Sequence, residues 1–409
     1  MRSRAIRVSS SRWRLVALSA LLLLLAGCDD GGGSGSTIAS GPSTPTPVNN
    51  TQAIQVNPGP ANEDIDVAFT SVTICAPGTA TCQTIPNIEI DTGSIGLRLI
   101  ASQVTISLPQ VSDGTGNRLG NCTVFADNSY LWGPLSMADV HMAGEKASGV
   151  PIQLLGDASF ASVPNSCNSG GTDDDSIAVL GANGILGIGL FRQDCGPSCV
   201  TSTSPNLYFS CPGANCTGTT VPLASQLQNP VWMFPQDNNG FLMTLPAIGA
   251  TGQASVSGSL IFGIGTQSNN ALNGAQVYTA DNTGAFSVTF NGTVYSGSFI
   301  DSGSNGIFFL DGQTLGISEC TDNPGFYCPN ATQSYSVITT GTNGAAGTVA
   351  FNVANADTLF ATGNSAFNNL GGSNGQSFDL GLPFFFGRNV FIGIEGQTTP
   401  GGTGPYWAY

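Results

Sequence analysis

The sequence contains very little histidine, lysine or charge of either sign. Of its 409 residues 9% are charged, and because His141 is the only histidine, a metal site built from several histidines is excluded. A serine or cysteine nucleophile would have only His141 as its base, and the alternating residues around it indicate an ordinary strand position. Lys146 is the only lysine, and the chain has no GxxxxGK sequence followed by Ser or Thr that would bind phosphates. Carboxylates remain as the groups on which catalysis could rest.

The few basic residues are concentrated at the N-terminus. Five of the ten Lys and Arg residues lie before residue 15, whereas all 25 Asp and Glu residues follow residue 28. A chain from residue 28 onward would therefore have five basic against 25 acidic residues, a net charge of −20. This charge argues against nucleic acid as a partner. Low charge density with 55 glycines favours a β-rich protein outside the cytoplasm.

The first 51 residues do not have the composition of a folded domain. A basic start is followed by the apolar run Leu15–Leu25, which is short for a membrane span, and then by Ala26, Gly27 and Cys28. This pattern resembles a bacterial lipobox, so we expect a lipoprotein signal peptide over residues 1–27 and lipid on Cys28. An ordinary secretory signal is the alternative. Residues 28–51, rich in Gly, Ser, Thr and Pro, are expected to form a flexible tether.

The cysteines form an even set once Cys28 is assigned to lipid. In an exported chain, ten remaining cysteines indicate disulfide bonds. Their spacing favours four short loops and one long one, and a zinc site over Cys195–Cys216 is the alternative. The expected pairs are Cys75 with Cys82, Cys122 with Cys167, Cys195 with Cys199, Cys211 with Cys216, and Cys320 with Cys328.

The remaining residues indicate two β-rich lobes. Short alternating or apolar runs separated by Gly, Asn, Ser and Thr dominate, and helical periodicity is scarce. Asn291-Gly292, between two such runs, is a strong signal for a β-hairpin turn. About 360 residues are too many for one simple core. We place an N-terminal lobe at residues 52–245 and a C-terminal lobe at 246–409, with the boundary among turn residues.

One phrase occurs twice, as Ile90-Asp91-Thr92-Gly93-Ser94 and Ile300-Asp301-Ser302-Gly303-Ser304. In each half an apolar segment containing glycine follows, around Gly187 and Gly381. This repetition indicates a duplicated fold that brings Asp91 and Asp301 together. Two adjacent carboxyl groups that share one proton can activate water for hydrolysis.

The residues beside each aspartate suit such a site. Gly93 and Gly303 allow the backbone to approach closely, so that N–H groups can face the carboxylates. Ser94 and Ser304 can donate hydrogen bonds to carboxylate oxygens, and Thr92 and Ser302 can hold one loop against the other. A chance double match in a chain rich in Gly, Ser and Thr, and a calcium-binding loop, are the alternatives.

These phrases resemble the two Asp-Thr/Ser-Gly-Ser/Thr motifs of the pepsin-type aspartic peptidases. Ile185-Leu186-Gly187 and Leu380-Gly381 resemble that family's apolar segments before glycine, and Ser257–Gly263 resembles its strand into the second lobe. The resemblance covers most of residues 52–395. It implies an all-β, bilobal pepsin-like acid protease fold, with two duplicated β-barrel lobes, a cleft between them and Asp91 and Asp301 as the catalytic pair.

The resemblance also implies a β-hairpin flap with a tyrosine, for which Tyr130 is the first candidate and Trp132 the second. The family's Tyr-Gly-x-Gly flap tip is absent. Residues 29–64 contain no Lys or Arg, so the basic prosegment of pepsin-type zymogens is absent as well. Asp237–Gly240, Phe262–Gln267 and Leu382–Arg388 further resemble a family of uncharacterised bacterial lipoproteins.

The resulting hypothesis is a membrane-anchored extracytoplasmic aspartic-type endopeptidase, lipid-anchored in the bacterial cell envelope with the periplasmic face favoured. Its partners would be a peptide or protein substrate and a lipid bilayer, bound through Cys28. We expect a monomer, with no metal, cofactor or nucleic acid. The alternative is a catalytically inactive pepsin-like scaffold that binds a peptide or a component of the envelope.

Overall fold

The computed structural model describes residues 49–125, 127–168 and 170–409. The expected signal peptide, the lipidated Cys28 and nearly all of the expected tether lie outside these residues. Of the expected tether, Asn49, Asn50 and Thr51 are described, and Thr51 begins the first strand. In the described part of the chain no helix is both long and apolar enough to cross a membrane.

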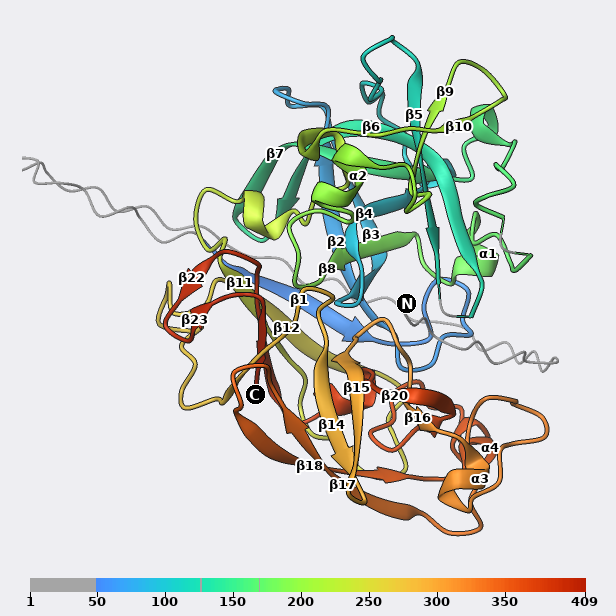
Figure 1. Cartoon of the computed structure of the whole chain (residues 1–409), viewed down its shortest axis with the longest axis vertical. Helices are drawn as coiled ribbons and strands as arrows, with labels where there is room; N and C mark the ends of the chain where they lie inside the picture. Colours follow the sequence, from blue (N-terminus) through green and yellow to red (C-terminus); the bar gives the residue numbers. More distant parts are fainter. Residues whose placement is uncertain (1–48, 126, 169) are drawn as a thin grey trace, which may run out of the picture.

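The strands form two groups with a central layer between them (Figure 1). The expected lobe boundary after residue 245 falls in the connection between two central strands. The central layer contains β1 (Thr51–Val56), β11 (Gly240–Thr244), β12 (Val256–Phe262), β21 (Asn389–Gly393), β24 (Tyr406–Ala408) and β13 (Val277–Thr279).

The N-terminal lobe is a strand barrel with a hairpin extension. β2 pairs with both β3 and β6, so that β6, β7, β4, β8, β3 and β2 form a closed ring. Closure leaves this ring without free sheet edges. The elements of this lobe are β2 (Ala68–Cys75), β3 (Cys82–Asp91), β4 (Ile95–Ile100), β5 (Arg118–Val124), β6 (Tyr130–Met142), β7 (Glu145–Leu155), α1 (Ile177–Leu180), β8 (Gly184–Ile188), α2 (Pro197–Thr201), β9 (Tyr208–Cys211) and β10 (Thr217–Gly218).

The C-terminal lobe has its own sheet, in the order β18-β17-β14-β15-β20-β16-β19. At the predicted hairpin, Asn291 and Gly292 have φ angles of 48° and 79°, which a tight turn between twisted strands requires. The elements are β14 (Phe286–Phe290), β15 (Thr293–Ile300), β16 (Ile307–Leu310), α3 (Gly312–Leu315), β17 (Gln333–Thr340), β18 (Ala346–Val353), α4 (Ala356–Phe360), β19 (Gly371–Gly372), β20 (Asn374–Leu380), and the separate pair β22 (Thr398–Thr399) and β23 (Gly402–Thr403).

The two lobes repeat one arrangement around the two aspartates. β8 lies parallel to β3 and antiparallel to β4, and β20 lies parallel to β15 and antiparallel to β16. In each lobe, therefore, the two strands that an aspartate loop joins lie on either side of a third strand. Gly187 lies on this third strand in the first lobe, and Gly381 directly follows it in the second. A Cβ on Gly187 would lie 2.7 Å from the Ser94 hydroxyl, and one on Gly381 would lie 2.1 Å from the Gly306 carbonyl oxygen, so both glycines let the strand approach the aspartate loop. The prediction of a duplicated, bilobal all-β fold is confirmed.

All five predicted cysteine pairs are disulfide bonds in the structure. The longest loop is closed by Cys122 and Cys167, 45 residues apart, and the shortest by Cys195 and Cys199, four apart. Four of the bonds staple local loops of 4 to 8 residues, as the spacing predicts. The cysteines of the zinc alternative are therefore joined in disulfides and are not thiolate ligands.

Candidate active site

Asp91 and Asp301 stand at the ends of equivalent strands and face each other between the lobes. Asp91 is the last residue of β3, and Asp301 follows β15 directly. Both are buried, and a hydrogen bond joins their side chains. The Gly93 N–H donates to Oδ1 of Asp91 at 2.7 Å and also to Oδ1 of Asp301 at 3.1 Å. One backbone donor thus contacts both carboxyl groups.

Each carboxyl group also receives hydrogen bonds from its own loop. The Ser94 N–H donates to Oδ1 of Asp91 at 3.1 Å, and the Gly303 N–H donates to Oδ1 of Asp301 at 2.8 Å. The Ser304 hydroxyl lies 3.1 Å from Oδ2 of Asp301. Backbone donors stabilise negative charge on a carboxylate, so the loops provide a setting for an ionised group.

The two hydroxyl residues after the aspartates link the loops to each other. The Ser302 N–H donates to the Thr92 hydroxyl at 2.9 Å, and the Thr92 hydroxyl donates to the carbonyl of Ile300 at 3.4 Å. In the reverse direction, the Thr92 N–H donates to the Ser302 hydroxyl at 3.2 Å, and that hydroxyl donates to the carbonyl of Ile90 at 2.7 Å. This reciprocal set fixes the two strand ends, and therefore the two carboxyl groups, relative to each other.

The pKa of Asp301 is raised well above its ordinary value. Burial is the largest cause, because it disfavours the charged form, and the negative charges of Asp91 and then Asp379 raise the pKa further. The hydrogen bond from the Gly303 N–H acts in the opposite direction. Two carboxyl groups in contact cannot both ionise easily, so the pair holds one proton over a range of pH.

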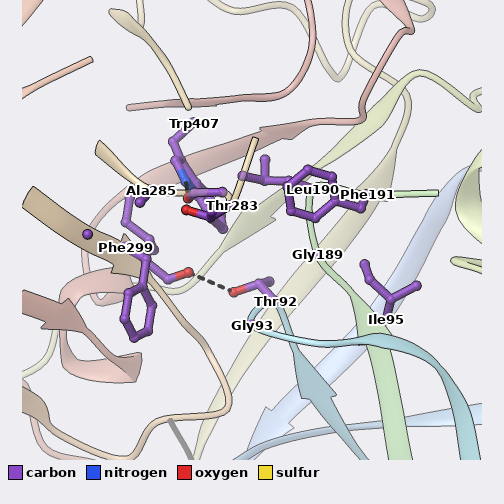
Figure 2. Close-up of a pocket in the computed structure, with 13 residues that line it drawn as sticks. Thr92, Gly93, Ile95, Gly189, Leu190, Phe191, Thr283, Ala285, Phe299 and Trp407 are labelled. Carbon is purple, nitrogen blue, oxygen red and sulfur yellow. Dashed lines mark hydrogen bonds between the residues drawn. The ribbon is translucent and has the colours of Figure 1, made fainter. Parts of the chain in front are cut away.

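A cavity of about 340 Å³ adjoins the first aspartate loop and the end of β15 (Figure 2). Its wall contains Thr92 and Gly93 from the first aspartate loop and Phe299 and Ile300 from the end of β15. The dashed line at Thr92 in Figure 2 is the hydrogen bond that the Thr92 hydroxyl donates to a backbone carbonyl, that of Ile300. Pockets of this size accommodate small ligands or single side chains. The other lining residues are Ile95, Gly189, Leu190, Phe191, Thr283, Gly284, Ala285, Gly297 and Trp407.

The two flap candidates lie in a different cluster. Tyr130 and Trp132 are on β6, which forms a hairpin with β5, and both are buried with Phe160 and Phe209. The Trp132 indole N–H donates to the carbonyl of Phe160 at 2.8 Å. Neither residue is among those that line the cavity beside the aspartates.

Other titratable groups noted in the sequence lie on the barrel strands. His141 pairs with Thr73 on β2 and Lys146 on β7, and partial burial, followed by the charge of Lys146, lowers its pKa. Lys146 forms an ion pair of 2.7 Å with Asp139. In the described residues, Cys320, Cys328 and Asp357 have the spacing of a metal site, but the two sulfur atoms are joined in a disulfide.

A family model described as "Protein of unknown function (DUF3443)" matches residues 46–409. The chain belongs to this family. The match covers both aspartate loops and all of the strands described above. The resemblance to an uncharacterised family is thus confirmed, and membership in DUF3443 brings no activity with it. No curated protein matches the chain.

The fold of this DUF3443 protein is similar to that of a solved aspartic proteinase from Irpex lacteus. The TM-score is 0.52 at 13% sequence identity, and the match covers 88% of this chain and 96% of the proteinase. At this identity the likeness establishes the fold alone. The predicted pepsin-like fold is confirmed.

Sequence reasoning missed several residues at this site. Oδ2 of Asp379, on β20, lies 2.7 Å from the Ser304 hydroxyl, and in the sequence Asp379 stands in the apolar segment around Gly381. A single acidic residue within the apolar run from Phe378 to Phe386 was the available signal. Phe191, Phe299 and Trp407 at the cavity come from distant segments, and their sequence contexts show nothing that distinguishes them from core residues.

Proposed function

We propose that this protein is a membrane-anchored, extracytoplasmic aspartic-type endopeptidase that hydrolyses peptide bonds through Asp91 and Asp301. The contact between these two buried carboxyl groups, with one backbone donor shared by both, is the observation that carries the proposal. Such a pair in its singly protonated form has an acid and a base within reach of one bound water.

The proposed reaction needs one proton on the pair, and the raised pKa of Asp301 favours its location there. Ionised Asp91 takes a proton from a water molecule as the water oxygen bonds to the substrate's carbonyl carbon. Asp301 gives its proton to the carbonyl oxygen, which produces a neutral diol. Collapse of the diol breaks the C–N bond: Asp91 donates its new proton to the leaving nitrogen, and a diol hydroxyl returns a proton to Asp301.

The cavity supports a peptide as the substrate. It begins at Thr92 and Gly93, directly after Asp91, and its wall includes the apolar side chains of Phe191, Phe299 and Trp407. A peptide whose reacting bond lies at the aspartates would place a neighbouring apolar side chain there, and burying that side chain would favour binding.

Asp91→Asn and Asp301→Asn test the proposal directly. Each removes one ionisable carboxyl with little change in shape, so each should lower the rate of cleavage of a fluorescently labelled, unfolded protein at acid pH by roughly 10²–10⁴-fold. Asp66→Asn is the matched control, because Asp66 is equally buried but accepts its hydrogen bond from the Phe367 N–H. Full activity in either Asp91→Asn or Asp301→Asn would refute the catalytic role of the pair.

The membrane anchor is a separate proposal that rests on the sequence, because Cys28 lies outside the described residues. Lipid on Cys28 would hold the protein in the cell envelope, with the periplasmic face favoured. The wild type, expressed in a Gram-negative bacterium, should incorporate labelled palmitate and partition into a detergent phase. Cys28→Ser should do neither, and unchanged labelling of this variant would contradict the proposal.

The alternative is an inactive pepsin-like scaffold that binds a peptide or an envelope component. The position of Tyr130 and Trp132 favours it, because both pack in a separate cluster and neither lines the cavity next to Thr92 and Gly93. A peptide in which a hydroxyl-bearing carbon replaces the scissile carbonyl distinguishes the two functions. An enzyme should bind it at least about a hundredfold more tightly than the matching substrate, and a scaffold should bind both equally.

A further inference from the structure

A third buried carboxyl group lies next to the aspartate pair. Asp379 is on β20 and is fully buried, and its Oδ2 lies 2.7 Å from the Ser304 hydroxyl. The same hydroxyl lies 3.1 Å from Oδ2 of Asp301. Ser304 therefore links Asp379 to Asp301. Asp301 is in turn linked to Asp91, because the Gly93 N–H donates to Oδ1 of both.

The duplicated fold shows that this carboxyl has no counterpart in the other lobe. Leu186 pairs with Ile90 just before Asp91, and Leu380 pairs with Ile300 just before Asp301. The residue that precedes each leucine is Ile185 in the first lobe and Asp379 in the second. The second lobe thus has an ionisable group where the first has an apolar one.

The two equivalent serines differ accordingly. The buried Ser94 hydroxyl has no hydrogen-bond partner among the described residues, whereas the Ser304 hydroxyl contacts two carboxyl groups. A hydroxyl has only one hydrogen to donate. If Ser304 donates to one carboxylate, the second contact is a hydrogen bond only when the other carboxyl is protonated and donates to Ser304. The geometry thus favours at least one proton shared between Asp301 and Asp379.

We propose that Asp379 is a positioning residue that, through Ser304, shares protons with Asp301 and extends to higher pH the range in which the aspartate pair keeps its working proton. The inference rests on the proposed function of Asp91 and Asp301. It adds that Asp379, which has no counterpart in the N-terminal lobe, sets the pH range over which the pair works.

The charges around Asp379 set the direction of the effect. Its neighbours in the sheet, Phe299 on β15 and Phe308 on β16, carry no charge, and the acids on its chain of contacts are Asp301 and, beyond it, Asp91. Because both bond to Ser304, the Asp301 and Asp379 oxygens lie within about 6 Å of each other. A negative charge at that separation in a buried site makes loss of the Asp301 proton harder by on the order of one pH unit or more.

Asp379→Asn removes the charge but keeps the size and a donor for Ser304. In a pH profile of kcat/KM on an unfolded protein, the midpoint of the alkaline limb should fall by about one pH unit, with the maximum value within roughly threefold of wild type. The control Asp66→Asn should leave the midpoint unchanged. Equal alkaline midpoints for Asp379→Asn and wild type would overturn the proposal.

A second readout separates this proposal from the peptidase assignment. Carbon-13 NMR of protein labelled at the aspartate carboxyl carbons follows the protonation of the pair without turnover, with Asp91→Asn and Asp301→Asn assigning the signals. The transition should move to lower pH in Asp379→Asn. If the wild type cleaves nothing but this shift occurs, the peptidase proposal fails and the role of Asp379 stands. An unmoved transition refutes the role of Asp379 whether or not the protein cleaves.

Discussion

Gly93 and Gly303 show how single residues determine the geometry of the site. A Cβ on Gly93 would lie 2.6 Å from Cγ of Asp301, and one on Gly303 would lie 2.9 Å from Cγ of Asp91. Each loop therefore approaches the carboxyl group of the opposite lobe more closely than any side chain would allow. Because the contact crosses between the lobes, neither loop alone reveals why its glycine is required.

Gly93→Ala should therefore disturb the pair. The added methyl group must displace the Asp301 carboxyl, so we expect at least a tenfold loss of kcat/KM and a loss of roughly 1–3 kcal/mol in the free energy of unfolding. Assays on unfolded protein and urea denaturation would measure both. Gly375→Ala is the control, since Gly375 is exposed and a Cβ there would have open space around it. Wild-type activity in Gly93→Ala would contradict the close approach.

At the scale of elements, the ends of β3 and β15 are held together by the exchange of hydrogen bonds between Thr92 and Ser302. Thr92 and Ser302 are buried, and so are Ile90 and Ile300, whose carbonyls accept the hydrogen bonds of the two hydroxyls. Each hydrogen bond that is lost therefore leaves a donor or an acceptor that water cannot reach. The two strands come from different lobes and pair with different third strands. The exchange therefore aligns two separately built elements.

Ser302→Ala should weaken this link. It leaves the Thr92 N–H and the Ile90 carbonyl unsatisfied, which should lower the free energy of unfolding by about 2–4 kcal/mol, with a parallel loss of activity. Urea denaturation followed by fluorescence would measure the change. Ser302→Thr copies the residue of the first loop and keeps the hydroxyl, so its stability should stay close to that of wild type. Equal losses for both variants would show that packing, and not the hydroxyl, holds the strands.

For the molecule as a whole, several buried or half-buried acids have raised pKa values. Burial, and then the charge of Asp237, raises the pKa of Glu145 from 4.5 to about 7. Burial, and then the charge of Asp175, raises the pKa of Asp173 from 3.8 to about 6. Such groups bind their protons more tightly in the folded than in the unfolded chain. Their contribution to stability is complete below about pH 4 and is lost as the pH rises toward 7.

The protein should accordingly be more stable near pH 5 than near pH 8. Glu145 alone should account for a decrease of about 2–3 kcal/mol in the free energy of unfolding over that interval. Urea denaturation at a series of pH values would show the slope, and Glu145→Gln should flatten it. Glu319→Gln, at an exposed glutamate, should leave the slope unchanged. A slope that survives in Glu145→Gln would contradict this assignment.

The sequence alone was sufficient to predict the fold class and the disulfide bonds. Alternating runs and turn residues such as Asn291-Gly292 act locally, because strand faces and hairpin turns depend on neighbouring residues. Close cysteine spacing similarly limits which pairs can meet. The two aspartate phrases indicated the duplication, because the backbone conformation of each loop depends on residues within the phrase itself.

Only the tertiary structure decided which groups surround the aspartates. It places Asp379 against Ser304, 75 residues away in the chain, and it joins Phe191, Phe299 and Trp407 in one cavity. It also packs Tyr130 and Trp132 in a separate cluster. These positions depend on strand order and on the approach of two lobes, which no local pattern encodes. The sequence therefore determined the two acidic loops, and the packing of the lobes determined the charges and the space that those loops meet.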